Sequence, residues 1–334
     1  MMNKIYKLNN QIKHYDWGSK EILPQFLGVN NNEGTPYAEL WMGTHNAAPS
    51  QIELNTELKN LNELSGELPF LFKLLAVEKP LSIQVHPNKE QAINGFIQEN
   101  ESGLDINSPE RKYKDKNHKS EILCAITPFT LMAGFKKQED ITASLAVLTD
   151  DQKKLIKYFE TLYPEDNAVY TPLYFNIITL QPYQAVFLPA GVPHAYLSGF
   201  GVELMNNSDN VLRGGLSSKY IDINEFMKIV KRDPFMPEII TPDLQSKYSF
   251  SLPGEDFLLS IIHGNGEVIL SEQGSVICII TEGELVSDGL TFKKGESFFI
   301  PKDTEQLILK GNFILFMASE LSISERSKTR IHAK

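Results

Sequence analysis

Four side chains of this sequence have types that could together bind a metal ion: Gln84, His86, Glu121 and His194. Gln84 and His86 are two positions apart in LSIQVHPNK, so on a β-strand they would point to the same face. Neutral imidazoles and a carboxylate are ordinary zinc ligands, whereas an amide oxygen is a weak and uncommon one. With a divalent ion the set keeps a net positive charge, and such an ion could polarise a sugar oxygen as a Lewis acid.

The spacing of Gln84 and His86 does not by itself establish a metal site. A Gln-x-His pair on a strand is more often a solvated or hydrogen-bonded pair. Apolar and polar residues alternate from 81 to 86, which predicts a strand with one polar row.

Short apolar runs elsewhere in the chain are rich in Val, Ile, Phe and Leu and are separated by Gly, Pro, Asn and Asp. This pattern predicts a mainly β protein of sandwich or barrel type. The clearest helical periodicity lies at about 138–161 and about 222–231. In the second segment Asp222 is the expected N-cap, with Glu225 at the capping-box position. The first segment lies between Glu121 and His194, and we expect it to be an insertion into a β domain.

An internal repeat involves the segment around His194. LPAGVPHAYLSG contains the spacing P-x-G-x-x-H, which ends at His194. Near the C-terminus, FFIPKDTEQ repeats the strand-and-turn pattern, with Asp303 in place of the glycine and Gln306 at the position of His194. We therefore expect a second β domain that has no metal site.

Composition limits the classes of protein that the sequence fits. A chain of 334 residues corresponds to roughly two domains, and 42% hydrophobic with 22% charged residues is typical of a globular protein. The net charge of −10 argues against a nucleic-acid or anionic-membrane partner. Cys124 and Cys278 lie in apolar, strand-like runs rather than in a disulfide scaffold. No signal-peptide core or spanning apolar stretch is evident, so we expect a cytoplasmic protein.

Five separated motifs resemble those of the type I phosphomannose isomerases, which belong to the cupin superfamily. They are YAELWMGTH, KPLSIQVHPNK, NHKSE, LPAGVPHAYLSG and NNSDNVLRGGLSSKYID. They occur in the family's order and cover about two thirds of the chain, which is much harder to obtain by chance than one motif. The resemblance implies two cupin-like jelly-roll β domains. The catalytic domain would comprise 1–135 and 166–232, with a short helical insertion at 136–165 and a metal-free cupin-like domain at 233–334.

The resemblance also implies an activity. Members of this family are zinc-dependent aldose–ketose isomerases that interconvert mannose 6-phosphate and fructose 6-phosphate through an enediol or enediolate. The reaction links glycolysis to mannose metabolism and GDP-mannose synthesis. The family's zinc ligands, one ion per subunit, correspond to Gln84, His86, Glu121 and His194, and its catalytic arginine corresponds to Arg213.

Other matched positions are expected to line the pocket. The candidates for proton transfer share ionisable side chains: Glu203, Asp209, His118 and Lys119. The candidates for substrate binding are basic, hydroxyl or aromatic: Lys79, Ser82, Lys219 and Trp17. Each has a plain alternative role, because Asp209 lies in an Asn-rich turn, His118 fits an exposed loop, and a tryptophan is often simply core. No single base is assigned.

Two departures from the family pattern stand out. The helical insertion is shorter than in long family members, and NHKSE replaces the common NHKPE, with Ser120 at a position that is not a ligand. The alternative functions are a non-enzymatic sugar-phosphate-binding cupin and another metal-dependent cupin enzyme. For the isomerase the expected partner is a small sugar phosphate, and the chain is expected to be a monomer or a weak homodimer.

Overall fold

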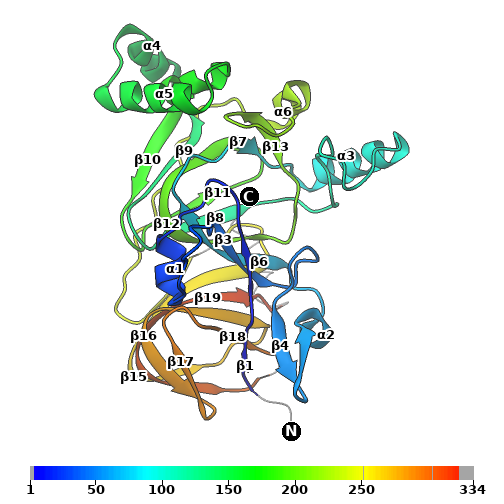
Figure 1. Cartoon of the computed structure of the whole chain (residues 1–334), viewed down its shortest axis with the longest axis vertical. Coiled ribbons are helices and arrows are strands. Elements are labelled where there is room, and N and C mark those ends of the chain that lie inside the picture. The colour runs from blue at the N-terminus through cyan, green and yellow to red at the C-terminus, as the bar shows by residue number, and fades with distance from the viewer. Residues whose placement is uncertain (1–3, 251, 303, 323–334) are drawn as a thin grey trace. The chain divides into compact units, whose positions relative to one another are not determined.

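The computed structural model describes residues 4–250, 252–302 and 304–322, and this part of the chain is mainly β, as the sequence predicts. Two compact units are present (Figure 1). Unit 1 comprises the described residues of 1–76, 202–207 and 241–334, and unit 2 comprises 77–201 and 208–240. The functional domain boundaries expected from the resemblance stay a prediction.

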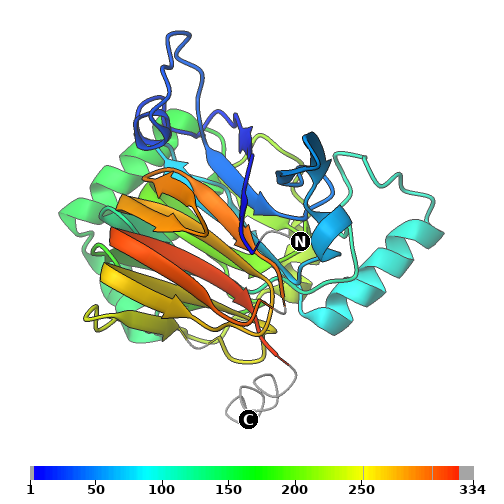
Figure 2. The ribbon, with the colours of Figure 1, turned by 90° about the horizontal axis from the view of Figure 1, so that it is seen from below.

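Seven strands of the described part of unit 1 form one antiparallel sheet, in the order β1-β18-β16-β19-β15-β14 with β17 paired to β16. Figure 2 shows the C-terminal strands side by side, coloured yellow to red. Alternate residues of β16, including Val276, Cys278 and Ile280, face one apolar core. The strands are β1 (Tyr6–Lys7), β14 (Lys247–Phe250), β15 (Phe257–Leu270), β16 (Val276–Ser287), β17 (Leu290–Lys293), β18 (Ser297–Ile300) and β19 (Leu307–Glu320).

The N-terminal part of unit 1 contributes further strands and two short helices. The strand order is β2-β3-β6, and β4 and β5 form a separate two-stranded sheet. Gly28 ends α1 in the left-handed conformation (φ 66°), which glycine adopts without steric cost. The elements are β2 (Gln11–Lys13), α1 (Ile22–Leu27), β3 (Glu39–Gly43), β4 (Gln51–Leu54), β5 (Glu57–Asn60), α2 (Asn62–Ser65) and β6 (Phe70–Val77).

Unit 2 contains the strands that carry most of the candidate site. Strand β12 pairs with β9, which pairs with β10, while β7 pairs with both β12 and β13, and β8 pairs with β11. After Gly201, β12 continues into unit 1. The strands are β7 (Ile83–Val85), β8 (Glu121–Ala125), β9 (Phe129–Phe135), β10 (Phe175–Leu180), β11 (Ala185–Leu188), β12 (His194–Asn206) and β13 (Leu212–Gly215).

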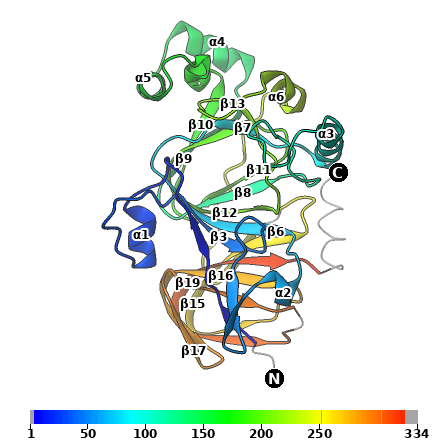
Figure 3. The same cartoon turned by 45° about the vertical axis from the view of Figure 1, so that its right-hand side comes forward.

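Both predicted helical segments of unit 2 are confirmed. The first forms α4 (Gln138–Ala146) and α5 (Asp150–Leu162), which lie beside one another in Figures 1 and 3. The second forms α6 (Ile223–Ile229), and the side chain of Asp222 accepts a hydrogen bond from the Glu225 N–H, as expected of an N-cap. A 3-10 helix, η1 (Asn167–Leu173), contacts α5 and β10.

Helix α3 (Lys89–Glu101) was not predicted. It begins with a capping box between Asn88 and Gln91, and the apolar residues at 92, 93, 96 and 97 have helical spacing, but its buried residues are Ala92, Gly95 and Glu99. Among the described residues no helix is long and apolar enough to cross a membrane.

The expected internal repeat has a structural counterpart. In the first copy β11 ends directly before Pro189 and β12 begins at His194. In the second copy β18 ends directly before Pro301, and β19 begins directly after Gln306. Asp303 lies outside the described residues.

Candidate metal centre

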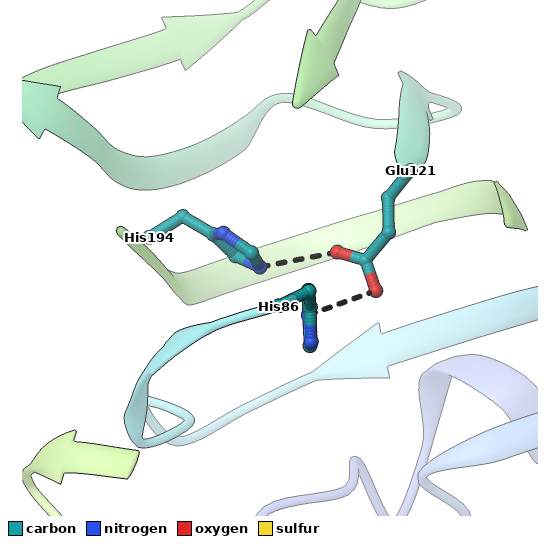
Figure 4. Close-up of side chains that lie close together, drawn as sticks. All are labelled: His86, Glu121 and His194. Carbon is teal, nitrogen blue, oxygen red and sulfur yellow. Dashed lines mark ion pairs between the residues drawn. The ribbon is translucent and has the colours of Figure 1, made fainter. Parts of the chain in front are cut away.

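Three of the four expected metal ligands lie together in unit 2 (Figure 4). The candidate donor atoms of His86, Glu121 and His194 are all within 4.8 Å of one another. Glu121 Oε1 lies 3.3 Å from His86 Nε2, and Glu121 Oε2 lies 3.1 Å from His194 Nε2. Each of these side chains is at most 2% exposed. The carboxylate therefore stands between two imidazoles at a buried position.

Hydrogen bonds at the Nδ1 atoms of the two histidines determine which nitrogen of each imidazole carries no hydrogen. His86 Nδ1 is 2.8 Å from the Asn210 carbonyl oxygen, and His194 Nδ1 is 3.0 Å from the Val192 carbonyl oxygen. A carbonyl only accepts, so each Nδ1 carries the hydrogen and each Nε2 presents a lone pair. These lone pairs face the carboxylate oxygens of Glu121, and among the described residues His194 Nε2 has no hydrogen-bond partner. The Nε2 lone pairs and the carboxylate oxygens would repel one another, and a cation between them would bind both. The residues therefore fit a zinc ion.

The secondary structure explains how His86 and His194 reach this position. His194 is the first residue of β12, and His86 directly follows β7. The polar row expected at 82–86 is therefore shorter than predicted, because the strand ends at Val85. The next residue after His86 is Pro87, which cannot donate to a strand ladder. Gly191, with φ 87°, turns the chain before β12, and its N–H bonds the His86 carbonyl at 2.9 Å.

Gln84, the fourth expected ligand, lies at the centre of a row of cross-strand partners. In the β12–β7 pair its partner is His194, and in the β7–β13 pair its partner is Arg213. Residues directly opposite each other in antiparallel strands project to the same face of the sheet. The register thus places the Gln84 amide beside His194 and places Arg213 in the same row.

Lys119 brings a positive charge to the donor atoms. Its Nζ lies 2.8 Å from Glu121 Oε1 and 3.4 Å from His86 Nε2, and the side chain is buried. Burial, with the Lys119 charge, lowers the pKa of His86 to about 4. Burial alone would raise the pKa of Glu121, but the charge of Lys119 holds it well below its usual range. A neutral imidazole and an ionised carboxylate are the protonation states that metal binding requires.

The other catalytic and substrate-binding residues predicted in unit 2 lie near the metal ligands in the sequence, but they are not part of the donor cluster. Lys79 and Lys219 are exposed, whereas Ser82, His118 and Asp209 are partly buried. Asp209 donates its backbone N–H to a carboxylate oxygen of Asp115 at 2.9 Å. The roles expected for these residues remain predictions.

Two predicted residues belong to unit 1. Trp17 stacks on Tyr15, with ring centroids 5.8 Å apart. Glu203 is buried and accepts a hydrogen bond from Lys73 Nζ at 3.0 Å. Inside unit 1 Glu203 is therefore one half of a buried ion pair, and its proposed part in proton transfer stays a prediction.

Two contacts of the centre were missed in the sequence. The Tyr196 hydroxyl donates to Glu121 Oε2 at 3.4 Å. Tyr196 follows His194 by two positions on β12, so the period-two rule could have identified it. The Asn210 carbonyl that holds His86 is a backbone group, and no residue pattern marks it.

Comparison with known proteins agrees with this geometry. Residues 5–138 match the family model described as phosphomannose isomerase type I, catalytic domain. The mannose-6-phosphate isomerase of Escherichia coli (strain K12) is 35% identical over 379 aligned positions, which span 92% of this chain and 97% of the relative. A crystal structure of zinc-bound mannose 6-phosphate isomerase has a TM-score of 0.85 and 33% identity over 96% of this chain and 100% of that chain. The Salmonella typhimurium enzyme bound to its substrate and zinc is equally similar, with a TM-score of 0.85 and 33% identity over the same shares of both chains. The chain belongs to the type I phosphomannose isomerase family.

Proposed function

We propose that this chain is a zinc-dependent mannose-6-phosphate isomerase that interconverts mannose 6-phosphate and fructose 6-phosphate. The observation that carries the proposal is the buried donor set of His86, Glu121 and His194, with Gln84 and Arg213 in the adjacent strand row. Solved relatives of this fold hold zinc, and one of them also holds its substrate. A non-enzymatic sugar-phosphate-binding protein would not need this combination of metal donors and a neighbouring guanidinium.

The reaction requires a balanced transfer of hydrogen. A base removes the proton from C2 of mannose 6-phosphate, and a proton is delivered to C1. The C1 carbonyl oxygen gains a proton and the C2 hydroxyl loses one, which gives fructose 6-phosphate through an enediol or enediolate. When bound, zinc supplies Lewis acidity that favours negative charge on the sugar oxygens.

Residues of this chain would bind and orient the sugar phosphate. Arg213 offers a planar guanidinium, which can form two parallel hydrogen bonds to an enediolate or a phosphate. The buried Lys119 adds a second positive charge next to the donors. Lys79, Ser82, Lys219 and Trp17 are the further proposed substrate contacts. The proton-transfer group is sought among four ionisable residues: Glu203, Asp209, His118 and Lys119.

We place the enzyme in the cytoplasm, where it would connect fructose 6-phosphate with mannose use and mannosyl-donor synthesis. Cys124 and Cys278 are free, buried thiols, which suits a reducing compartment. A monomer or weak homodimer remains the expected assembly.

The deciding experiment measures metal content and turnover in the same purified protein. We expect about one zinc per chain by atomic emission, formation of fructose 6-phosphate from mannose 6-phosphate, loss of turnover after chelation and recovery after zinc is returned. Unchanged turnover by the fully chelated protein would overturn the metal-dependent mechanism. Tight calorimetric binding of mannose 6-phosphate without turnover would favour the non-enzymatic alternative.

A further inference from the structure

A hydrogen-bonded network behind the donor set joins three segments of unit 2, and its centre is Asn210. This side chain is fully buried. Its Oδ1 accepts hydrogen bonds from the backbone N–H groups of Lys114 at 2.7 Å and Asp115 at 3.2 Å. Its Nδ2 donates to the carbonyl oxygens of Asp115 at 2.9 Å and Asn117 at 2.8 Å. The amide thus uses both of its donors and both lone pairs on one neighbouring loop.

Asp115, in that loop, makes a second set of hydrogen bonds to the segment around Asn210. Its carboxylate accepts from the Ser208 hydroxyl at 2.9 Å and from the Asp209 N–H at 2.9 Å. The same carboxylate accepts from the Asn117 N–H at 2.8 Å, which stabilises the turn of the loop itself. Segments 114–117 and 208–210 are therefore held together from both sides.

Each of the joined segments leads directly to the donor set. The 114–117 loop continues into Lys119 and Glu121, and the 208–210 segment continues into β13 and Arg213. The Asn210 carbonyl accepts the Nδ1 hydrogen of His86 at 2.8 Å. The buried Asn210 thus connects the His86 imidazole, the segment that carries Glu121 and the strand that carries Arg213.

We propose that Asn210 is a positioning residue for the metal centre, which acts through the orientation and tautomer of His86 and through the placement of Glu121. An outer hydrogen bond that keeps the hydrogen on Nδ1 makes Nε2 available to a metal ion, and loss of such a partner typically weakens metal binding ~10–100-fold. The inference rests on the metal site of the proposed function, but not on the isomerase reaction.

An aspartate at position 210 provides the sharpest test because it has the same shape. Asn210→Asp would direct a carboxylate oxygen at the carbonyl oxygens of Asp115 and Asn117, so two hydrogen bonds would become repulsive contacts. The matched control is Asn31→Asp in unit 1. There Asn31 Nδ2 also donates to two carbonyl oxygens, of Lys20 and Thr35, each at 2.8 Å, but holds only a loop of that unit.

The measurement is zinc affinity of the full chain, by competition with a chromogenic chelator, together with urea unfolding and the visible spectrum of the cobalt-substituted protein. We expect N210D to weaken zinc binding ~10–100-fold and to alter the cobalt spectrum, whereas N31D leaves both unchanged. A folded N210D protein whose zinc affinity is within about twofold of the parent would overturn the inference. If the parent itself binds no zinc, the metal site of the proposed function fails instead.

A second variant keeps the inference testable if N210D does not fold. Asp115→Asn retains one acceptor oxygen but replaces the other with an amide nitrogen, so part of the link to Ser208 and Asp209 is lost. We expect a smaller loss of zinc affinity in the same direction, with the cobalt spectrum shifted. Unchanged affinity and spectrum in a folded D115N protein would overturn the inference equally.

Discussion

Arg213 is the direct cross-strand partner of Gln84 in the β7–β13 pair, while His194 faces the same Gln84 from β12. Side chains in such a row share one face of the sheet. An amide, an imidazole of the donor set and a guanidinium are therefore aligned by backbone pairing rather than by a flexible loop. A bound sugar phosphate that reaches the donor set would meet the Arg213 guanidinium in the adjacent position.

The first prediction concerns the guanidinium of Arg213. Arg213→Lys keeps the positive charge but removes the planar pair of donors, so kcat/KM should fall ~10–100-fold, as expected for lost charge-assisted hydrogen bonds. Zinc content should stay the same, because Arg213 is not in the donor cluster. Steady-state kinetics and metal analysis check this. The exposed Arg232 of the same unit provides the control, R232K, which should retain full activity. Unchanged kcat and KM in R213K would remove Arg213 from the mechanism.

Local patterns in the sequence predict much of the secondary structure. The helices within 138–162 and at 223–229 have an apolar periodicity that is visible in the local sequence alone. Helix α3 has a shorter apolar pattern, at positions 92, 93, 96 and 97, and two of its buried residues are Gly95 and Glu99. Its capping box, Asn88 with Gln91, was a further clue.

The centre itself depends on contacts that local patterns do not contain. Residue types and motif resemblance identified His86, Glu121 and His194, and the structure brings them together. The row that joins Gln84 to Arg213 depends on strand register between segments far apart in the chain, which follows from tertiary packing. The Asn210 carbonyl is a backbone group that every residue carries, so only the folded chain shows that it binds His86.

A second prediction concerns the carboxylate of the donor set. Glu121→Gln keeps the shape but removes the negative charge, which leaves the Lys119 ammonium unpaired beside His86. Zinc affinity should fall more than ~100-fold, since replacing a charged ligand with a weak amide ligand should exceed the effect of an outer-shell change. Competition titration with a chelator measures this. The control is Glu99→Gln, at a buried carboxylate paired with Arg111, which should lower stability without changing zinc affinity. Equal zinc affinity in parent and E121Q would exclude Glu121 as a ligand.

A third prediction concerns the two thiols. Burial raises the pKa of both Cys124 and Cys278 well above the usual range, so each remains a protonated, unreactive thiol at about pH 8. In the folded protein both should react with a disulfide reagent at least ~100-fold more slowly than a free thiol. In guanidinium chloride both should react at the ordinary rate. Absorbance of the released chromophore measures the two rates, and rapid labelling without denaturant would contradict the buried placement of at least one cysteine.

The last prediction concerns the buried charges of unit 1. Lys73 Nζ lies 3.0 Å from Glu203 Oε2 and 3.9 Å from Glu39 Oε2, and all three side chains are buried. Removing one partner of a buried ion pair leaves an uncompensated charge, so Lys73→Met should lower the free energy of unfolding by about 3–5 kcal/mol. The exposed pair of Lys59 with Glu57 provides the comparison, since K59M should cost at most about 1 kcal/mol. Urea denaturation of both variants measures the difference. Equal midpoints for K73M and the parent would show that the buried pair of Lys73 and Glu203 does not stabilise the fold.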